Sequence, residues 1–327
     1  MQLLRLSAAL FLACSMLACG QSSGPSVTTS APGPAPSLPL APAKKEIGLV
    51  MKTLTNPFFV EMERGARRAE AELGIALKVK TAAQETSIEQ QIQLVDDLIA
   101  AKVVAIVIAP GDSQRLIPSL KKAVGAGIQV VNIDNRLDPA ALRQADMAPI
   151  PFIGVDNDNG AYKAGKFLVE GVNTPTEAAL LEGIRSADNA HQRSTGARRA
   201  FSENKLIKLV ASEAANWEIN VAYDVTKSIF AKHPHVKLIF AANDMMALGA
   251  VKYLQESGKK NVKVVGYDAL DETLAEIKSG RMAATVDQQA AEQGYQGVNL
   301  AVKMLQGVPV PSLTTIETRL VTAAGVR

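Results

Sequence analysis

Polar and aromatic side chains follow the strands that the sequence predicts. The stretch from Lys52 to Phe59 comes directly after an apolar run, with Asn56 at a helix N-cap position and Pro57 at the first helical position. An ordinary strand-to-helix turn with two core phenylalanines is the alternative for this stretch. The residues that follow the other predicted strands are Asp134, Asn135, Asp156, Asn157, Arg193, Trp217, Asn243, Asp244, Asp268 and Gln288.

These residue types suit an uncharged ligand with many hydroxyl groups. Carboxylates accept hydrogen bonds from hydroxyls, cations donate to them, and amides do both. Aromatic rings can stack on the C–H face of a sugar. Because the cations are matched by aspartates, the pattern does not indicate a phosphate clamp. Simple turn, cap or core roles are the alternatives for Asp134, Asn243 and Trp217. The candidate ligand contacts of each type are the acceptors Asp134 and Asp268, the donors Lys52 and Arg193, the amides Asn56, Asn243 and Gln288, and the rings Phe58, Phe59 and Trp217.

Motifs for catalysis or for a cofactor are missing from the sequence. There is no Gly-x-Ser-x-Gly elbow, and His191, His233 and His235 do not have a metal-ligand spacing. Gly125-Ala126-Gly127 precedes a predicted strand, so it indicates a helix end and not a dinucleotide site. The segment 156–160 resembles a calcium loop only weakly, because its twelfth position is Phe167. We therefore expect no enzyme activity, no cofactor and no metal.

Alternating strand and helix patterns must position the candidate residues. Apolar runs predict strands, and a period near 3.6 predicts the helices between them. The first lobe is predicted as strands 47–51, 75–79, 103–108 and 128–133 with helices 59–73, 86–100 and 112–124, the last kinked at Pro118. After an excursion at 137–148, the second set has strands 152–155, 178–181, 206–211, 236–240, 262–265 and 282–286, with helices 160–170, 193–202, 218–230, 245–254, 271–278 and 290–305, and a final extended segment, 313–321.

The fold class predicted from this order is α/β, with two doubly wound parallel-sheet lobes. Ligands of such sheets bind outside the carboxyl ends of the strands, so we expect the site in a cleft between the lobes. The chain has 327 residues, 47% of them hydrophobic, which is enough for two cores. The formal net charge is only +3, which does not indicate the basic surface that a nucleic-acid-binding protein needs.

The N-terminal segment has the features of a lipoprotein signal. A short positive region ending at Arg5 precedes the apolar run Leu6–Leu17, which is too short to span a bilayer. The only two cysteines are Cys14 and Cys19. We expect a signal peptide at 1–18, lipidation of Cys19, and a disordered Pro/Ser/Gly tether within 19–45, which implies a periplasmic or cell-surface location. A plain signal peptide cut nearby is the alternative.

From Glu46 onward the chain resembles the periplasmic sugar-binding proteins of ABC importers, of the ribose and allose/psicose type. The stretches that carry the resemblance are 52–59, 131–134, 183–196, 209–217, 242–249, 265–268 and 284–288. It implies the periplasmic binding protein type I fold, a monomer, and a three-segment hinge near Val155, Gln288 and Leu313. The implied lobes are 46–154 plus 289–313 and 155–288 plus 314–327. The implied ligand contacts are Lys52, Asn56, Phe58, Phe59, Asp134, Arg193, Trp217, Asn243, Asp268 and Gln288.

The sequence departs from this family pattern in two ligand-facing loops. Glu218-Ile219 follows the tryptophan, and Asn135, which we also count as a candidate ligand contact, stands between Asp134 and Arg136. These changes bear on which sugar or polyol is bound, while Lys52 favours the allose type over the ribose type. Capture of a sugar or polyol by hinge closure and delivery to an importer is the leading hypothesis. A ligand-sensing partner of a chemoreceptor or sensor kinase, a transcription repressor core and a carbohydrate enzyme are the alternatives.

Overall fold

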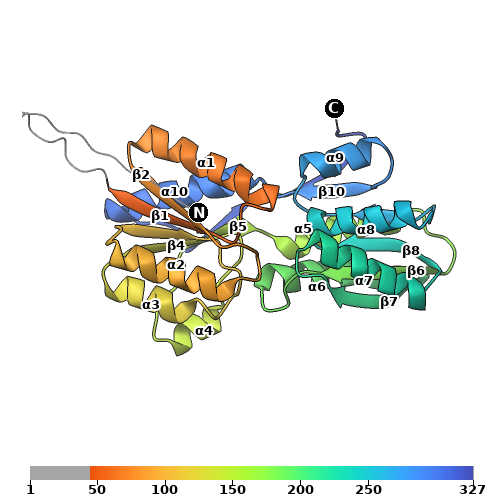
Figure 1. Ribbon diagram of the computed structural model, residues 1–327, viewed down its shortest axis with the longest axis horizontal. Helices are drawn as coiled ribbons and strands as arrows, with labels where there is room; N and C mark the ends of the chain where they lie inside the picture. Colours follow the sequence, from red (N-terminus) through yellow and green to blue (C-terminus); the bar gives the residue numbers. More distant parts are fainter. Residues whose placement is uncertain (1–44, 327) are drawn as a thin grey trace, which may run out of the picture. The chain divides into compact units, whose positions relative to one another are not determined.

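The computed structural model describes residues 45–326, which belong to one compact unit. The predicted signal peptide (1–18), Cys19 and all but the last residue of the predicted tether (19–45) lie outside the described residues. Within the described range, two six-stranded sheets form two α/β lobes (Figure 1). No helix among these residues is long and apolar enough to cross a membrane.

The first lobe has a parallel sheet that is covered by helices on both faces (Figure 1). Leu49 packs with the helices of one face and the next residue, Val50, with those of the other, as expected for a parallel strand that is buried on both sides. In sheet order the strands are β11 (Leu313–Ile316), β5 (Phe152–Val155), β4 (Gln129–Ile133), β3 (Ala105–Ile108), β1 (Glu46–Met51) and β2 (Ala76–Thr81). The helices are α1 (Pro57–Leu73) and α10 (Ala290–Leu305) on one face, α2 (Ile88–Ala100) and α3 (Ile117–Gly125) on the other, and the short α4 (Pro139–Gln144).

The second lobe repeats this plan with one antiparallel edge strand. β12 pairs antiparallel with β10, and the other described strand pairs of this sheet are parallel. The strands in sheet order are β12 (Arg319–Thr322), β10 (Ala284–Asp287), β9 (Lys263–Val265), β8 (Val236–Ala241), β6 (Thr176–Glu182) and β7 (Ile207–Ala214). The helices are α5 (Asn157–Val169), α6 (Asp188–Ser202), α7 (Ile219–Lys232), α8 (Asp244–Glu256) and α9 (Asp271–Lys278).

The chain passes between the two sheets after β5, after β10, and between β11 and β12. The predicted extended segment 313–321 consists of two strands, β11 and β12, and the predicted last crossing near Leu313 was wrong. Leu313 to Ile316 pair with β5 of the first sheet, and Ile316 is buried in the first core. The last crossing therefore lies at residues 317–318. Extended sequence alone does not say which of two sheets a strand joins.

The third helix of the first lobe begins later than predicted. The expected helix 112–124, kinked at Pro118, is a turn followed by α3, which starts at Ile117. Asp112 Oδ1 accepts hydrogen bonds from the backbone N–H groups of Gln114 and Arg115, at 2.7 and 2.8 Å, and these bonds hold the turn. Pro118 lies in the first turn of α3, where its missing N–H has no helical partner to lose. The predicted kink is therefore absent from α3.

Candidate functional site

The loop after β1 places Lys52 and Asn56 at the carboxyl edge of the first sheet. Asn56 caps α1: its backbone is extended and its Oδ1 accepts a hydrogen bond from Phe58 N at 3.1 Å. Its amide nitrogen is then free to donate to Glu85 Oε1 at 2.8 Å. Both Lys52 and Asn56 are buried. The N-cap of α1 therefore fixes the side-chain amide of Asn56 so that it also faces the buried carboxyl of Glu85.

Two aromatic rings stand beside these polar groups. Phe58 and Phe59 meet edge to face, with ring centroids 5.1 Å apart and an interplanar angle of 82°. Lys52 Nζ lies 5.4 Å from the centroid of Phe59, within the range of a cation–π contact. Both rings are almost fully buried and belong to the first core while also lining the cavity described below.

Asp134 pairs with Lys52 across two loops of the first lobe. Asp134 Oδ2 lies 2.9 Å from Lys52 Nζ, and both side chains are buried. Asp134 has a φ of +62°, a left-handed conformation that non-glycine residues seldom adopt. Trp217 and Asp268, at +70° and +129°, share this feature. Such backbone strain gathers at functional sites, and here three candidate residues carry it.

Arg193 is the corresponding cation of the second lobe. It lies in the second turn of α6, and not at the start of a helix as predicted, because α6 begins at Asp188. Its Nε donates to Asn157 Oδ1 and its Nη1 to Ala242 O, both at 2.8 Å. Nη1 is also 3.7 Å from Asp268 Oδ1, and the guanidinium stacks over Tyr267 at 3.8 Å. The guanidinium is therefore held in one orientation.

Amide side chains complete the second lobe's contribution. Asn243 caps α8 by accepting a hydrogen bond from Met246 N at 2.9 Å. Gln288, after β10, donates from Nε2 to Asp268 Oδ1 at 2.6 Å. Trp217 Nε1 is buried and has no hydrogen-bond partner among the described residues, and the same holds for Asn189 Oδ1. The buried indole N–H and this buried amide oxygen are therefore available to a ligand.

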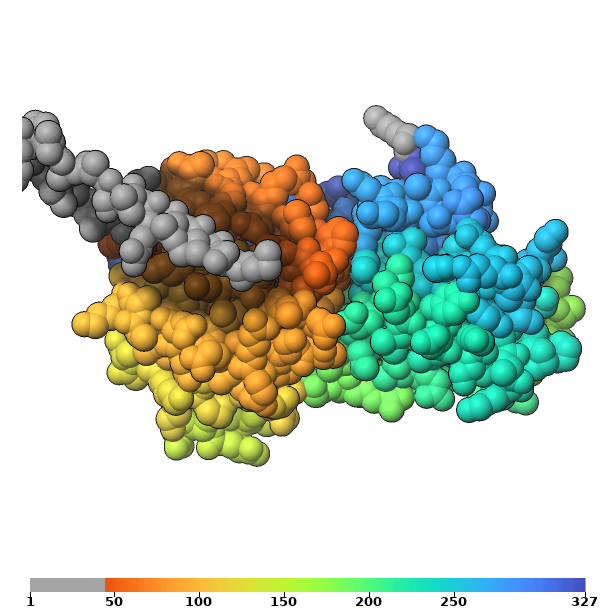
Figure 2. Space-filling view, in the orientation of Figure 1, coloured from red at the N-terminus to blue at the C-terminus, as the bar shows by residue number. Residues whose placement is uncertain are grey.

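These side chains line one small cavity of about 10 Å³ between the lobes. That volume is about what a single water molecule needs, so the lobes or the lining side chains move before a sugar can enter. The space-filling view shows side chains of the two lobes meeting along their boundary (Figure 2). Ten of the eleven candidate ligand contacts line the cavity, together with two residues that were not predicted. The lining residues are Lys52, Asn56, Phe58, Phe59, Glu85, Asp134, Asn189, Arg193, Trp217, Asn243, Asp268 and Gln288.

Asn135 is the candidate that the structure places elsewhere. It is fully buried and its amide donates to Pro110 O at 3.0 Å, while its Oδ1 accepts from the backbone N–H of Asn189 at 3.2 Å. Asn135 follows Asp134 directly, but its side chain is used in loop and interlobe contacts. Its assignment as a residue lining the ligand cavity was therefore wrong.

Glu85 and Asn189 are the two lining residues that the sequence reasoning missed. Glu85 lies between β2 and α2, so the rule of polar residues after strand ends applies to it as well. Asn189 is four residues before Arg193 on α6 and therefore shares its helix face. A correct start for α6 would have identified it.

The cavity holds three carboxyl groups beside two cations. Burial raises the pKa of Glu85 to about 7, although Lys52 and the hydrogen bond from Asn56 lower it. Burial also raises the pKa of Asp268 well above its ordinary value, with Arg193 acting against that rise. Lys52 and Arg193 thus each stand beside a carboxyl of the cavity. This balance of charges suits a neutral occupant.

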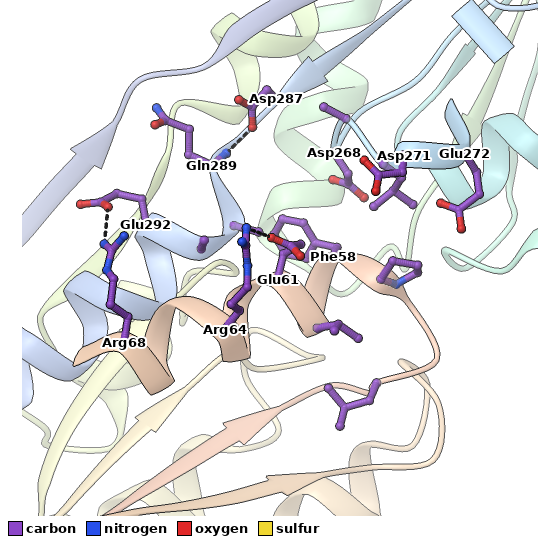
Figure 3. Close-up of a pocket in the computed structure, with 17 residues that line it drawn as sticks. Phe58, Glu61, Arg64, Arg68, Asp268, Asp271, Glu272, Asp287, Gln289 and Glu292 are labelled. Atoms are coloured by element: carbon purple, nitrogen blue, oxygen red, sulfur yellow. Dashed lines mark hydrogen bonds and ion pairs between the residues drawn. The ribbon is translucent and has the colours of Figure 1, made fainter. Parts of the chain in front are cut away.

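A larger groove adjoins the cavity. Figure 3 shows it between α1 and the loop before α9, with Phe58 and Asp268 among its lining residues. The ion pair Arg68–Glu292, at 3.4 Å, joins α1 to α10 at one end of it. Apart from Asp268, the charged residues of the groove are exposed or half-buried, whereas those of the small cavity are buried. The small cavity, whose polar lining residues are buried, is therefore the stronger candidate for a ligand site.

Comparison with known proteins agrees with this geometry. Residues 47–309 match the periplasmic binding protein domain. The D-ribose/D-allose-binding protein of Pseudomonas aeruginosa is 41% identical over 269 residues, which cover 81% of this chain and 84% of the relative. The D-allose-binding periplasmic protein of Escherichia coli is 32% identical over 288 residues, covering 86% and 93%.

A solved structure gives the same result. An ABC transporter periplasmic solute binding protein from Actinobacillus succinogenes, with bound D-allose, has a TM-score of 0.82 and 39% identity, covering 86% of this chain and 99% of that one. These matches confirm the predicted fold class, two α/β lobes with mostly parallel sheets. They also confirm the prediction of a solute-binding protein and not an enzyme.

Proposed function

Because this chain belongs to the periplasmic binding protein family, we propose that it captures a neutral monosaccharide or polyol in the interlobe cavity and delivers it to an ABC importer. The observation that carries the proposal is the pairing of charges in the cavity. Lys52 lies 2.9 Å from Asp134, and Arg193 lies 3.7 Å from Asp268. A charged ligand would break this balance, whereas hydroxyl groups can share it.

The polar and the aromatic lining residues recognise different parts of the ligand. The paired charges and the amides of Asn56, Asn243, Gln288 and Asn189 bind hydroxyl groups, and Glu85 adds a carboxyl beside Lys52. Trp217 presents an indole N–H as a further donor. The rings of Phe58, Phe59 and Trp217 stack on the C–H faces of the sugar. Names of relatives make D-allose and D-ribose the first ligands to test.

Binding is coupled to closure of the two lobes. The cavity takes Lys52, Asn56 and Asp134 from one lobe and Arg193, Trp217 and Asn243 from the other. A ligand can contact both groups at once only in the closed state, so it stabilises that state by its differential affinity. The three crossings of the chain between the sheets form the hinge.

A lipid anchor on Cys19 would hold the protein at a membrane surface. The motif Met16-Leu17-Ala18-Cys19-Gly20 supports this, and Cys14 is the only other cysteine. Incorporation of labelled palmitate into the wild type, and its loss in Cys19→Ala, is the expected result. Equal labelling of the two proteins would contradict the anchor.

A thermal-shift screen tests the proposed function. The panel contains neutral monosaccharides, tetritols, pentitols and inositols, and each is compared with phosphorylated sugars as charged controls. A ligand that binds the folded protein raises its unfolding temperature. Once the ligand concentration exceeds the dissociation constant, this rise grows with the logarithm of the concentration. We expect stabilisation by at least one neutral compound and by none of the phosphorylated ones. Stabilisation by phosphorylated sugars alone would contradict the proposal.

A further inference from the structure

Helix α6 begins without a capping side chain of its own. Its N-cap residue is Ala187, which makes no side-chain hydrogen bond to the first turn. The first N–H groups of a helix have no helical partner and need an acceptor when they are buried. Asp188 N donates to Ser113 Oγ at 2.9 Å, and Asn189 N donates to Asn135 Oδ1 at 3.2 Å. Both acceptors belong to the other lobe.

The two acceptors are held ready within the first lobe. Ser113 and Asn135 lie in the loops after β3 and β4. Asn135 Nδ2 donates to Pro110 O at 3.0 Å and to Ser113 Oγ at 3.3 Å, so the two side chains are bonded to each other. Ser113 N also donates to Ser186 O at 3.1 Å, which is a third interlobe bond at this point.

The capped helix carries two residues that line the cavity. Asn189 is in the first turn of α6 and Arg193 in the second, and both side chains are buried. We propose that Ser113 and Asn135 are positioning residues that cap α6 across the lobe boundary and so favour the closed site. They form a latch that does not touch the ligand, and their effect on binding rests on the proposed function. When the lobes separate, the backbone N–H groups of Asp188 and Asn189 lose these acceptors and must donate to water instead.

Amide hydrogen exchange of Asp188 and Asn189 tests the latch directly. It is measured with and without D-allose in the wild type, in Ser113→Ala and in the control Ser119→Ala, which changes a buried serine of α3 in the first lobe. We expect Ser113→Ala to exchange faster at these two amides, while Ser119→Ala matches the wild type. Asn135→Ala should act in the same direction. Unchanged exchange in Ser113→Ala under both conditions would overturn the proposal.

Calorimetry separates the latch from the proposed function. With D-allose as the probe, Ser113→Ala should bind about 3- to 30-fold more weakly than the wild type, the effect of losing one helix cap. At saturation its radius of gyration should equal that of the wild type. Equal affinity of Ser113→Ala and Ser119→Ala would overturn the coupling to binding. If Ser113→Ala exchanges faster but the wild type binds no sugar, the capping of α6 by Ser113 is confirmed and the proposed function is rejected.

Discussion

The indole ring of Trp217 lies against the backbone of Gly183, where a Cβ would be 2.0 Å from Trp217 Cζ2. Gly183 directly follows β6, and a side chain there would occupy the space of the ring. Two positions far apart in the sequence thus pack against each other, and the ring of Trp217 lines the cavity. The small residue in the loop is what allows the ring to reach the site.

Gly183→Ala should therefore displace the indole. We expect the affinity for D-allose to fall at least about tenfold, because overpacking costs roughly 1–3 kcal/mol and here it also moves a lining ring. Calorimetric titration measures the affinity. Gly125→Ala is the matched control, since its added Cβ meets nothing within 4 Å and should leave binding unchanged. Equal affinities of the two variants would contradict the packing argument.

Trp217 is the only tryptophan, so its emission reports on the cavity. Saturation with a bound sugar should change the intensity or the wavelength of its fluorescence, because the ring lines the site. A phosphorylated sugar, used as the control ligand, should leave the emission unchanged. A calorimetrically confirmed sugar complex with unaltered emission would show that Trp217 does not face the ligand.

Arg193→Ala should abolish detectable sugar binding while the protein stays folded. Truncating one partner of a buried hydrogen-bonded charge pair costs roughly 2–5 kcal/mol. Arg193→Lys should also bind weakly, because a lysine cannot reproduce the two directed bonds to Asn157 and Ala242. Arg199→Ala is the control: it removes a partly exposed ion pair between α6 and Asp158 of α5, and it should bind within about twofold of the wild type. Circular dichroism checks the fold, and undiminished binding by Arg193→Ala would remove it from the site.

Glu85 should make stability depend on pH. Its pKa is raised from 4.5 to about 7 by burial, so the folded state holds the proton more tightly than the unfolded state. This contribution is present in full below pH 4.5 and is lost as the pH rises through 7. Its size is roughly 3 kcal/mol, from about 1.4 kcal/mol for each unit of pKa.

Glu85→Gln mimics the protonated form and keeps an oxygen that can accept from Asn56. The variant should gain stability relative to the wild type between pH 5 and pH 8, as measured by urea unfolding at both values. Burial, the main cause of the raised pKa of Asp268, is common to the two proteins, whereas the smaller contribution of the Glu85 charge to that rise is lost in Glu85→Gln. Parallel pH profiles for the two proteins would contradict the role of Glu85.

Much of the site was predictable because parallel strands bring their carboxyl ends together. Lys52, Asp134 and Asp268 each follow a strand, and the topology then brings them to one place. Asn135 shows the limit of this rule, since adjacent residues of a loop point in different directions. The prediction of Asn189 as a lining residue requires the correct start of α6. That start has no capping side chain, so the sequence gives little signal for it.

The fold was likewise predictable from the hydrophobic periodicity, except where a strand could join either of the two sheets. The strand that ends before Lys52 and the strand Ala105–Ile108 are continuous apolar runs, and such runs identify buried strands. The extended segment after Leu313 has no comparable signal. Its first half joins one sheet and its second half the other, and only the pairing partners decide this.

Calorimetric titration of the wild-type protein with D-allose tests the central claim most directly. We expect one sugar bound per chain, with a dissociation constant in the micromolar range or tighter, and no heat from the 6-phosphate of the same sugar. A neutral ligand from the thermal-shift screen that binds more tightly than D-allose would fulfil the same claim. Tight binding of the phosphorylated sugar, with no binding by any neutral sugar or polyol, would contradict it.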